Sequence, residues 1–413
     1  MKILFLHQNF PAQFTHLAPK LNRIGHEVVA MSISNKSKSG EWNGVKIISE
    51  KVTGRTTPGV HPWVADFETK TIRGEACFRA GMKLKEEGFA PEKIIAHHGW
   101  GESLFIKEVW PEAKLGIYCE FFYHARGADV GFDPEFLSED IAEPCRIAHK
   151  NLNNLAHFPQ ANAGLSPTYW QASTFPDPFS GKITVIHDGI DTDIVRPDSS
   201  AYVNLNNGTI LTKKDEIVTF INRNLEPYRG YHIFMRALPR MLKDRPNARF
   251  ILIGEDGVSY GAKPNKDKYG DRTWKQIFID EVKDQISEND WARVHFVGKV
   301  PYGIFLRLMQ ISSVHVYLTY PFVLSWSSLE AMSAGCAIVA SDTQPVREAI
   351  SDNETGLLVN FFDYEGLARN VDILLDSPSL RDKLGKNARR FAIENYDLNT
   401  VCLPRQIEWV NNL

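Results

Sequence analysis

Short apolar runs and helix-spaced apolar residues alternate along this chain from its first residues onward. Ile3–Leu6 is a continuous apolar run of the kind found in a buried parallel strand. The segment 14–24 places apolar residues on one helical face, and Gly25 suits the position just after a helix. Val28–Ala30 then resumes as a second strand. This β–α–β order predicts a parallel sheet with right-handed crossovers.

The same alternation continues through both halves of the chain, which predicts an α/β fold. The runs are short, and Gly or polar residues follow many of them, as is typical of strand ends. In the first half, further strands are predicted at Lys93–Ala96, Leu115–Cys119 and Lys182–Ile186. In the second half, helices are predicted at Tyr231–Leu242 and Leu329–Ala334, and strands at Val218–Asn222, Phe250–Ile253, Val294–Val297, Val314–Leu318 and Ala337–Ala340.

A change in composition near residue 200 divides the chain. Residues 199–207 are rich in Ser and Asn, which favours a linker over residues 198–214. We therefore predict one domain over residues 1–197 and a second over residues 215–386. The last segment, residues 387–413, is predicted to be mainly helical and to cross back onto the first domain. Two such domains predict a cleft between the carboxyl ends of two parallel sheets, where ligands of α/β proteins bind.

Charge and cysteine content exclude several classes of protein. The 413 residues include 47 Lys and Arg and 50 Asp and Glu, so the net charge of −3 argues against nonspecific binding to nucleic acid. The five cysteines are far apart and form no CxxC pair, so we expect a reducing, cytoplasmic setting and neither a disulfide scaffold nor a zinc ribbon. No apolar run reaches the roughly 18–20 residues of a membrane span. A nicotinamide dehydrogenase is disfavoured because no GxGxxG follows a predicted strand.

Several segments of the chain resemble the motifs of one enzyme family. They are the pair Arg223 and Arg229 before a helix, Gly25–Val28 (GHEV), Ile186–Thr192 (IHDGIDT), Leu329–Ser341 (LEAMSAGCAIVAS) and Asn353–Val359 (NETGLLV). In their order along the chain, these segments are similar to the motifs of family-4 retaining glycosyltransferases. The resemblance implies the GT-B fold, in which two Rossmann-like βαβ domains face each other across a cleft. It also implies a sugar nucleotide as donor substrate and neither a metal nor another cofactor.

The resemblance places the donor diphosphate and ribose in the second half of the chain. Arg223 and Arg229 are expected to stabilise the negative charge that develops on the leaving diphosphate. The alternative is two solvated arginines at the start of a helix. Glu330 is expected to accept hydrogen bonds from the ribose hydroxyls. Its alternative is a glutamate that favours the positive end of a helix dipole.

The chain departs from the family motif at Phe322, where relatives carry a glutamate that contacts the transferred sugar. The serine-rich segment that follows is still expected to present backbone N–H groups and hydroxyls to the diphosphate at a helix N-terminus, unless its serines are only helix caps. In that segment we assign Ser325, Trp326 and Ser327 to the diphosphate.

Other positions are assigned to the base and to the cleft. Gly298 and Val300 are expected to hold the base through backbone groups, with uridine preferred over guanosine. Asn9, Gly254 and Leu324 are expected to line the cleft.

The first half of the chain resembles a subgroup of bacterial and cyanobacterial polysaccharide-assembly glucosyltransferases. The segments that carry this resemblance are His97–Glu102, Tyr118–Phe122 and Gly127–Pro134. Polar residues that follow predicted strands there are candidates for orienting the acceptor or handling its proton. These candidate catalytic residues are His97, Glu102, Glu120 and His124. The alternatives are strand-end histidines satisfied by the backbone, and a structural Glu120 paired with Arg126 or Arg146.

The sequence therefore predicts a retaining hexosyltransferase that uses a sugar nucleotide, with UDP-glucose as the preferred donor. The expected acceptor is a glycan or a lipid-linked sugar in exopolysaccharide or envelope polysaccharide synthesis. A lipid-linked acceptor would bring peripheral contact with the inner face of a membrane. Two alternatives stay open: a sugar-nucleotide epimerase of the same fold, and a non-catalytic sugar-nucleotide-binding relative, which the loss of the glutamate at Phe322 motivates. Turnover with and without an acceptor separates these three functions.

Overall fold

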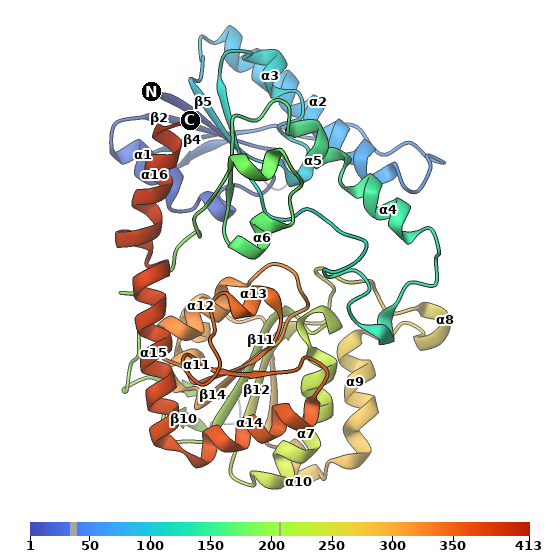
Figure 1. Cartoon of the computed structure of the whole chain (residues 1–413), viewed down its shortest axis with the longest axis vertical. Helices are drawn as coiled ribbons and strands as arrows, with labels where there is room; N and C mark the ends of the chain where they lie inside the picture. Colours follow the sequence, from blue (N-terminus) through green and yellow to red (C-terminus); the bar gives the residue numbers. More distant parts are fainter. Residues whose placement is uncertain (34–38, 206–207) are drawn as a thin grey trace. The chain divides into compact units, whose positions relative to one another are not determined.

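The computed structural model describes residues 1–33, 39–205 and 208–413 of the chain. It consists of two compact units, each built around its own parallel sheet (Figure 1). Unit 1 comprises Met1–Gly189 together with Asn399–Leu413, and unit 2 comprises Ile190–Leu398. Within these described ranges, no helix combines the length and the apolar composition that a membrane span needs.

The sheet of unit 1 has the order β3-β4-β2-β1-β5-β6-β7-β8 and is parallel except at its edge strand β3. Leu4 of β1 lies opposite Val29 on one side and Ile94 on the other, and all three side chains are buried. A strand that is buried on both faces needs a continuous apolar run, which explains the sequence pattern. The strands are β1 (Lys2–Leu6), β2 (Glu27–Ser32), β3 (Gly40–Trp42), β4 (Val45–Ser49), β5 (Lys93–His97), β6 (Lys114–Tyr118), β7 (Ala163–Ser166) and β8 (Ile183–Val185).

Helices from both ends of the chain pack on this sheet. Cys77, Ala80 and Leu84 of α2 join the apolar core that the strands build. Gly25 ends α1 with a φ of 97°, as the sequence predicts for a glycine after a helix. The helices of unit 1 are α1 (Leu17–Arg23), α2 (Ala65–Glu86), α3 (Ile106–Val109), α4 (Glu143–Lys150), α5 (Leu152–His157), α6 (Tyr169–Ser173) and α16 (Leu403–Asn411).

The chain returns to unit 1 at Asn399, and α16 packs beside α1 (Figure 1). A side chain on Gly116 of β6 would place its Cβ 2.5 Å from the ring of Trp409, so this position must be a glycine for α16 to lie so close. Lys93, which is 7% exposed, donates from Nζ to the carbonyl oxygens of Val410 and Asn411 at 2.6 and 2.7 Å.

The sheet of unit 2 is wholly parallel and has the order β13-β12-β11-β14-β15-β16. Its strands are β11 (Ile217–Asn224), β12 (Arg249–Glu255), β13 (Val294–Gly298), β14 (Val314–Tyr317), β15 (Ile338–Ser341) and β16 (Leu357–Val359). Its helices are α7 (Tyr231–Asp244), α8 (Lys266–Tyr269), α9 (Trp274–Val282), α10 (Glu288–Trp291), α11 (Tyr302–Ile311), α12 (Trp326–Ser333), α13 (Gln344–Arg347), α14 (Tyr364–Asp376) and α15 (Pro378–Tyr396).

The region expected to be a linker, residues 198–214, carries a two-stranded antiparallel sheet instead. Strand β9 (Tyr202–Asn204) pairs with β10 (Ile210–Thr212), and their central residues Val203 and Leu211 are buried in the core of unit 2. The Ser- and Asn-rich composition hid this alternation of buried and exposed positions. Residues 206 and 207 of the expected linker lie outside the described residues.

The boundary between the units also lies upstream of that region. Ile190 bridges to Asp397, and Val195 is buried in the core of unit 2. The hydroxyl of Ser333 further ties this segment to unit 2 by donating to the carbonyl oxygen of Val195. Unit 2 therefore begins at Ile190, eight residues before the expected linker at residue 198.

Candidate functional site

The carboxyl edge of the unit 2 sheet gathers most of the residues that the sequence assigned to the donor. After β11, a 3-10 turn at Pro227–Arg229 leads into α7 through Gly230. Gly230 has a φ of 69°, and a Cβ at this position would lie 2.3 Å from the Cβ of Leu318. Only glycine fits both the backbone conformation and the space. The close approach brings the start of α7 against the segment that follows β14.

Arg229 is a buried cation at this junction. It is 4% exposed, and its Nη1 atom donates to Oγ1 of Thr319 at 2.7 Å, to the carbonyl of Val323 at 3.1 Å and to the hydroxyl of Tyr317 at 3.4 Å. Burial acts to lower the pKa of Arg229, but Tyr317 and Tyr260 outweigh it and the pKa is raised. Within the described ranges, no carboxylate forms an ion pair with this guanidinium. The site thus holds a fixed positive charge that also clamps the loop after β14.

Arg223 differs from Arg229 in its surroundings. It lies near the end of β11, where the register against β12 shifts between Ile221 and Asn224. Its side chain is exposed, and among the described residues it makes neither an ion pair nor a hydrogen bond. The structure therefore gives one exposed and one buried arginine, not two equivalent cations.

The segment before α12 is built by its serines. Ser325 is the N-cap residue: its Oγ accepts from the N–H of Ser327 at 3.3 Å, and its own N–H donates to the hydroxyl of Tyr317 at 2.9 Å. Ser328 donates from its hydroxyl to the carbonyl of Ser325 at 2.8 Å. The capping role is thus present, and it leaves the positive end of the helix dipole at Trp326, which is 43% exposed. A cap and an anion site share this end of the helix.

Glu330, the residue assigned to the ribose, has a partner that the sequence analysis missed. The hydroxyl of Tyr302 donates to Oε1 of Glu330 at 2.8 Å. Burial raises the pKa of Glu330, and the hydrogen bond from Tyr302 acts in the opposite direction. Tyr302 begins α11 two residues after Val300, and Gly298 ends β13 with a φ of 64°. The residues assigned to the base therefore lie in the same short turn as the partner of Glu330.

A second missed residue, Glu226, anchors a loop over Arg229. Its carboxylate accepts from the backbone N–H groups of Ser259, Tyr260 and Gly261 at 2.9, 3.3 and 3.2 Å. Three N–H donors on one carboxylate fix the loop. The ring of Tyr260 then lies 4.9 Å from the guanidinium carbon of Arg229, within the range of a cation–π contact.

Phe322 stands where the family motif carries glutamate. It packs in an aromatic cluster with Tyr228, Tyr260 and Tyr320. Its ring centroid lies 5.5 Å from that of Tyr228 and 5.3 Å from that of Tyr260. Phe322 is 5% exposed, so it fills space in the loop and offers no polar group. The sequence predicted the loss of the carboxylate but not the cluster that replaces it.

Two of the residues assigned to the cleft are explained by packing. Leu324, assigned to the cleft, is 7% exposed and its side chain packs in the core of unit 2. Gly254 lies in β12, where a Cβ would approach Leu225 to 2.8 Å, so close packing requires this glycine. Asn9, in unit 1, has an exposed side chain, and its N–H donates to Nδ1 of His7 at 2.9 Å.

In unit 1, His97 and Glu120 lie together at the carboxyl edge of the sheet. Nδ1 of His97 accepts from the N–H of Gly99 at 3.2 Å, so the ring proton is on Nε2. Nε2 lies 3.6 Å from Oε2 of Glu120. The ring of His97 is buried and stacks on Trp100 at 4.3 Å and on Tyr118 at 5.3 Å. His97 is thus both satisfied by the backbone and aimed at a carboxylate that is 40% exposed.

The structure does not bring all four acceptor-side candidates together. Nε2 of His124 donates to the carbonyl of Thr174 at 2.7 Å, so this side chain has a structural hydrogen bond. Arg146 pairs with Glu143 and not with Glu120, which excludes one of the structural pairings weighed for Glu120. Glu102 is completely buried, and burial raises its pKa to about 7. It lies inside unit 1, where among the described residues neither of its oxygens has a hydrogen-bond partner.

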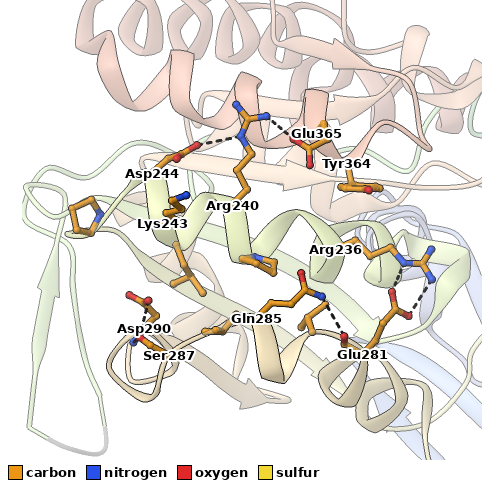
Figure 2. Close-up of a pocket in the computed structure, with 15 residues that line it drawn as sticks. Arg236, Arg240, Lys243, Asp244, Glu281, Gln285, Ser287, Asp290, Tyr364 and Glu365 are labelled. Atoms are coloured by element: carbon orange, nitrogen blue, oxygen red, sulfur yellow. Dashed lines mark hydrogen bonds and ion pairs between the residues drawn. The ribbon is translucent and has the colours of Figure 1, made fainter.

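A separate groove of 1130 Å³ lies on the outer helices of unit 2. Its lining includes none of the predicted site residues, and its two arginines are paired with carboxylates (Figure 2). Arg236 binds Glu281, and Arg240 bridges to Glu365. Because these cations are already neutralised, the groove is not a candidate for the donor diphosphate.

Two family models match the chain in sequence order. A model of the glycosyl transferase family 4 group matches residues 24–195, and a model of the glycosyl transferases group 1 matches residues 206–391. The first match coincides with most of unit 1, and the second lies within unit 2. This chain belongs to the glycosyltransferases that these two models describe. The prediction of a family-4 transferase enzyme is confirmed.

Whole-chain relatives agree with the family models. Glycogen synthase of Mycobacterium tuberculosis strain H37Rv is 23% identical over 410 residues, which cover 94% of this chain and 87% of the relative. Sucrose-phosphate synthase of Thermosynechococcus elongatus superposes with a TM-score of 0.74 at 17% identity and covers 100% of this chain and 99% of its own. HepE of Anabaena, solved in complex with UDP-glucose, superposes with a TM-score of 0.67 at 16% identity, with 100% of both chains covered. These likenesses confirm the predicted GT-B fold.

Proposed function

We propose that this glycosyltransferase transfers glucose from UDP-glucose to a glycan or lipid-linked acceptor in polysaccharide synthesis, with retention of the anomeric configuration. The observation that carries the proposal is the combination of two cations, a helix N-terminus and the Tyr302–Glu330 pair at one edge of the unit 2 sheet. Phosphate, ribose and base chemistry are thereby provided along a single sheet edge. The UDP-glucose complex of HepE, which has the same fold, supports UDP-glucose as the donor.

In this proposal the two arginines have different roles. Arg223 is exposed and has no partner among the residues that the structure describes, so it is the cation that closes on the leaving diphosphate. Arg229 contributes a fixed charge from its buried position. It also holds the Thr319–Val323 loop that leads into α12. The N-terminus of α12 adds backbone dipoles aimed at the same charge. Arg229 and the helix N-terminus are already in place, so they stabilise a developing anion without reorganising during the reaction, and we propose that the transfer needs no metal.

Glu330 binds the ribose, and the turn from Gly298 to Val300 binds the uracil through backbone groups. Glu330 is the fifth of the eight residues of α12, so the ribose and the diphosphate are held by one helix. The loss of a carboxylate at Phe322 removes one contact to the transferred sugar. The proposal therefore relies on the backbone and serine hydroxyls before α12 for that sugar.

On the acceptor side, the proposal assigns the orientation of the attacking hydroxyl to His97 and Glu120. The Nε2–H of His97 points at the partly exposed carboxylate of Glu120, which leaves the other carboxylate oxygen for an acceptor hydroxyl. The hydroxyl then attacks on the face that the diphosphate leaves, and a phosphate oxygen takes its proton. Neither side chain is required to form a covalent bond to the sugar.

Calorimetry in the presence of a chelator tests the donor half of the proposal. UDP and GDP are titrated into the wild type, Arg223→Ala and Glu330→Gln, with Arg236→Ala, an arginine of the separate groove, as the matched control. We expect UDP to bind in the wild type and the control, and each site variant to weaken it about 10-fold or more, the loss expected of a charge-assisted contact. Equal binding in all four proteins would refute the donor assignment.

Turnover measurements separate the proposal from its rivals. UDP-glucose is incubated with and without alkyl glycosides and lipid-diphosphate sugars, and the products are followed by NMR. A transferase forms an α-glycoside only when an acceptor is present, and an epimerase changes the sugar without one. Binding with no turnover against the whole acceptor panel would support the non-catalytic relative.

A further inference from the structure

Tyr302 holds Glu330 in one orientation before any ligand binds. The tyrosine is 54% exposed, yet its hydroxyl is committed to Oε1 of Glu330 at 2.8 Å. Its ring is backed by Phe305, with the ring centroids 5.6 Å apart and the planes tilted by 23°. Because Phe305 packs against one face of the Tyr302 ring, the ring is held in one orientation at the start of α11. The exposed area of Tyr302 therefore belongs to a fixed aromatic surface beside the carboxylate.

The hydrogen bond decides which acceptors Glu330 offers to a ligand. A carboxylate has about four lone-pair sites on two oxygens. Tyr302 takes one site on Oε1, which leaves Oε2 and the tyrosine oxygen itself as neighbouring acceptors. Two acceptors side by side match two vicinal hydroxyl donors. They do not match a sugar that lacks one of the hydroxyls, because one acceptor would then lose its partner in the complex.

We propose that Tyr302 determines the specificity of the donor site for a ribonucleotide over a 2′-deoxyribonucleotide, by orienting Glu330 and sharing the ribose diol with it. This inference rests on the proposed function, since it takes Glu330 as the ribose contact. It goes further by naming a residue outside the family motifs and a property, sugar discrimination, that the residue controls. Tyr302 acts here as a specificity-determining residue and takes no part in bond breaking.

Position in the chain supports the same role. Tyr302 lies two residues after the Gly298–Val300 turn, and Pro301 between them is the N-cap residue of α11. Glu330 comes from α12, 28 residues later. A contact between these two elements joins the base-binding turn to the ribose-binding helix. The conservative change to phenylalanine removes only the hydroxyl, keeps the packing on Phe305 and so isolates the hydrogen bond.

Calorimetry with UDP and 2′-deoxy-UDP tests the inference in the wild type, Tyr302→Phe and the control Tyr364→Phe, a tyrosine on α14 at the separate groove. We expect the wild type and the control to prefer UDP by at least about 10-fold, the discrimination expected when a site's hydrogen-bonding groups lose their partner. Tyr302→Phe should bring that preference within about 3-fold while still binding UDP. A preference unchanged in Tyr302→Phe would overturn the inference.

Two further variants complete the test. If the two residues act as a unit, Glu330→Gln and the double variant Tyr302→Phe/Glu330→Gln should show the same small preference within about 2-fold, because effects within one hydrogen-bonded pair are not additive. Additive losses would place Tyr302 outside the ribose contact and overturn the inference. Wild-type protein that binds no UDP would instead refute the proposed function, and the role of Tyr302 with it. Each failure thus gives a different result.

Discussion

Nη1 of Arg229 lies 2.7 Å from Oγ1 of Thr319, so the entrance to α7 and the loop after β14 are joined by a buried cation. The same nitrogen reaches the carbonyl of Val323 at 3.1 Å. Burying a charge is costly unless its hydrogen bonds are satisfied, and here neutral acceptors satisfy it in place of a carboxylate. The loop that leads into α12 is therefore held by a group that keeps its positive charge.

This arrangement predicts that Arg229→Lys weakens the fold and the site together. Lysine keeps the charge but lacks the planar fork that reaches several acceptors at once. We expect a loss of about 1–3 kcal/mol in the free energy of unfolding of unit 2 and about 10-fold weaker UDP binding. Urea titration and calorimetry measure the two quantities.

Arg223→Lys is the matched control for that experiment. Arg223 is exposed and makes no contact that the substitution would break within the described residues, so its stability should change by less than about 0.5 kcal/mol. Equal losses of stability in the two variants would contradict the buried role of Arg229.

Glu102 predicts a specific pH dependence of stability. Its pKa is raised from 4.5 to about 7, so between these values the folded protein holds a proton that the unfolded chain releases. The stability from this proton is fully present below pH 4.5 and is lost as the pH rises through 7. A shift of this size corresponds to about 3 kcal/mol.

The variant Glu102→Gln should lack this dependence. The free energy of unfolding of the variant minus that of the wild type, measured with urea, should rise from pH 5 to pH 8.5. The reason is that the amide of the variant does not ionise. Other groups titrate equally in both proteins, so the difference between the two curves isolates Glu102. A constant difference across this range would show that Glu102 does not titrate there.

Glu120→Gln should slow transfer while leaving the donor site intact. A neutral amide does not attract the Nε2–H of His97, 3.6 Å away, or hold an acceptor hydroxyl as a carboxylate does, so we expect kcat to fall by about 10²-fold or more, as for loss of a group that handles a proton. UDP binding should stay within about 2-fold, since Glu120 belongs to unit 1 and the donor residues to unit 2. Unchanged transfer by the variant would remove Glu120 from the proposed mechanism.

Lys93→Met should loosen the C-terminal helix. The ammonium group donates to the carbonyls of Val410 and Asn411, where a cation also favours the negative end of the α16 dipole. We expect a loss of about 1–3 kcal/mol and faster amide exchange over residues 403–411. Lys2→Met, at an exposed lysine of the neighbouring strand, is the control and should leave exchange in α16 unchanged.

Local patterns were enough to predict the sheets but not every element. Buried strands such as β1 and β12 are continuous apolar runs, and their burial on both faces is what the sequence records. Strand β7 (AGLS) carries too little apolar character to stand out, and the Ser- and Asn-rich stretch hid the hairpin of β9 and β10. Leu324 was assigned to the cleft because a motif position does not tell which way a side chain faces.

The site was predictable only where a motif named a residue. Tyr302 and Glu226 act through partners 28 and 33 or more residues away, and no local pattern marks such pairs. The position of three histidines at strand ends was a weak sequence signal of their local hydrogen bonding. His7, His97 and His187 each follow or end a strand, and in each the Nδ1 atom accepts the N–H of the residue two positions later. This shared local geometry gives each of these three histidines a structural role at the end of a strand.

The return of the chain to unit 1 has a consequence for synthesis on the ribosome. The contact between Lys93 and Val410 joins residues 317 positions apart, and all of unit 2 is translated between them. The nascent unit 1 emerges early but must wait for α16, which is translated after unit 2. The surface at Gly116, against which the ring of Trp409 packs, stays exposed to solvent during that interval. The first unit to be translated is thus the last to be finished.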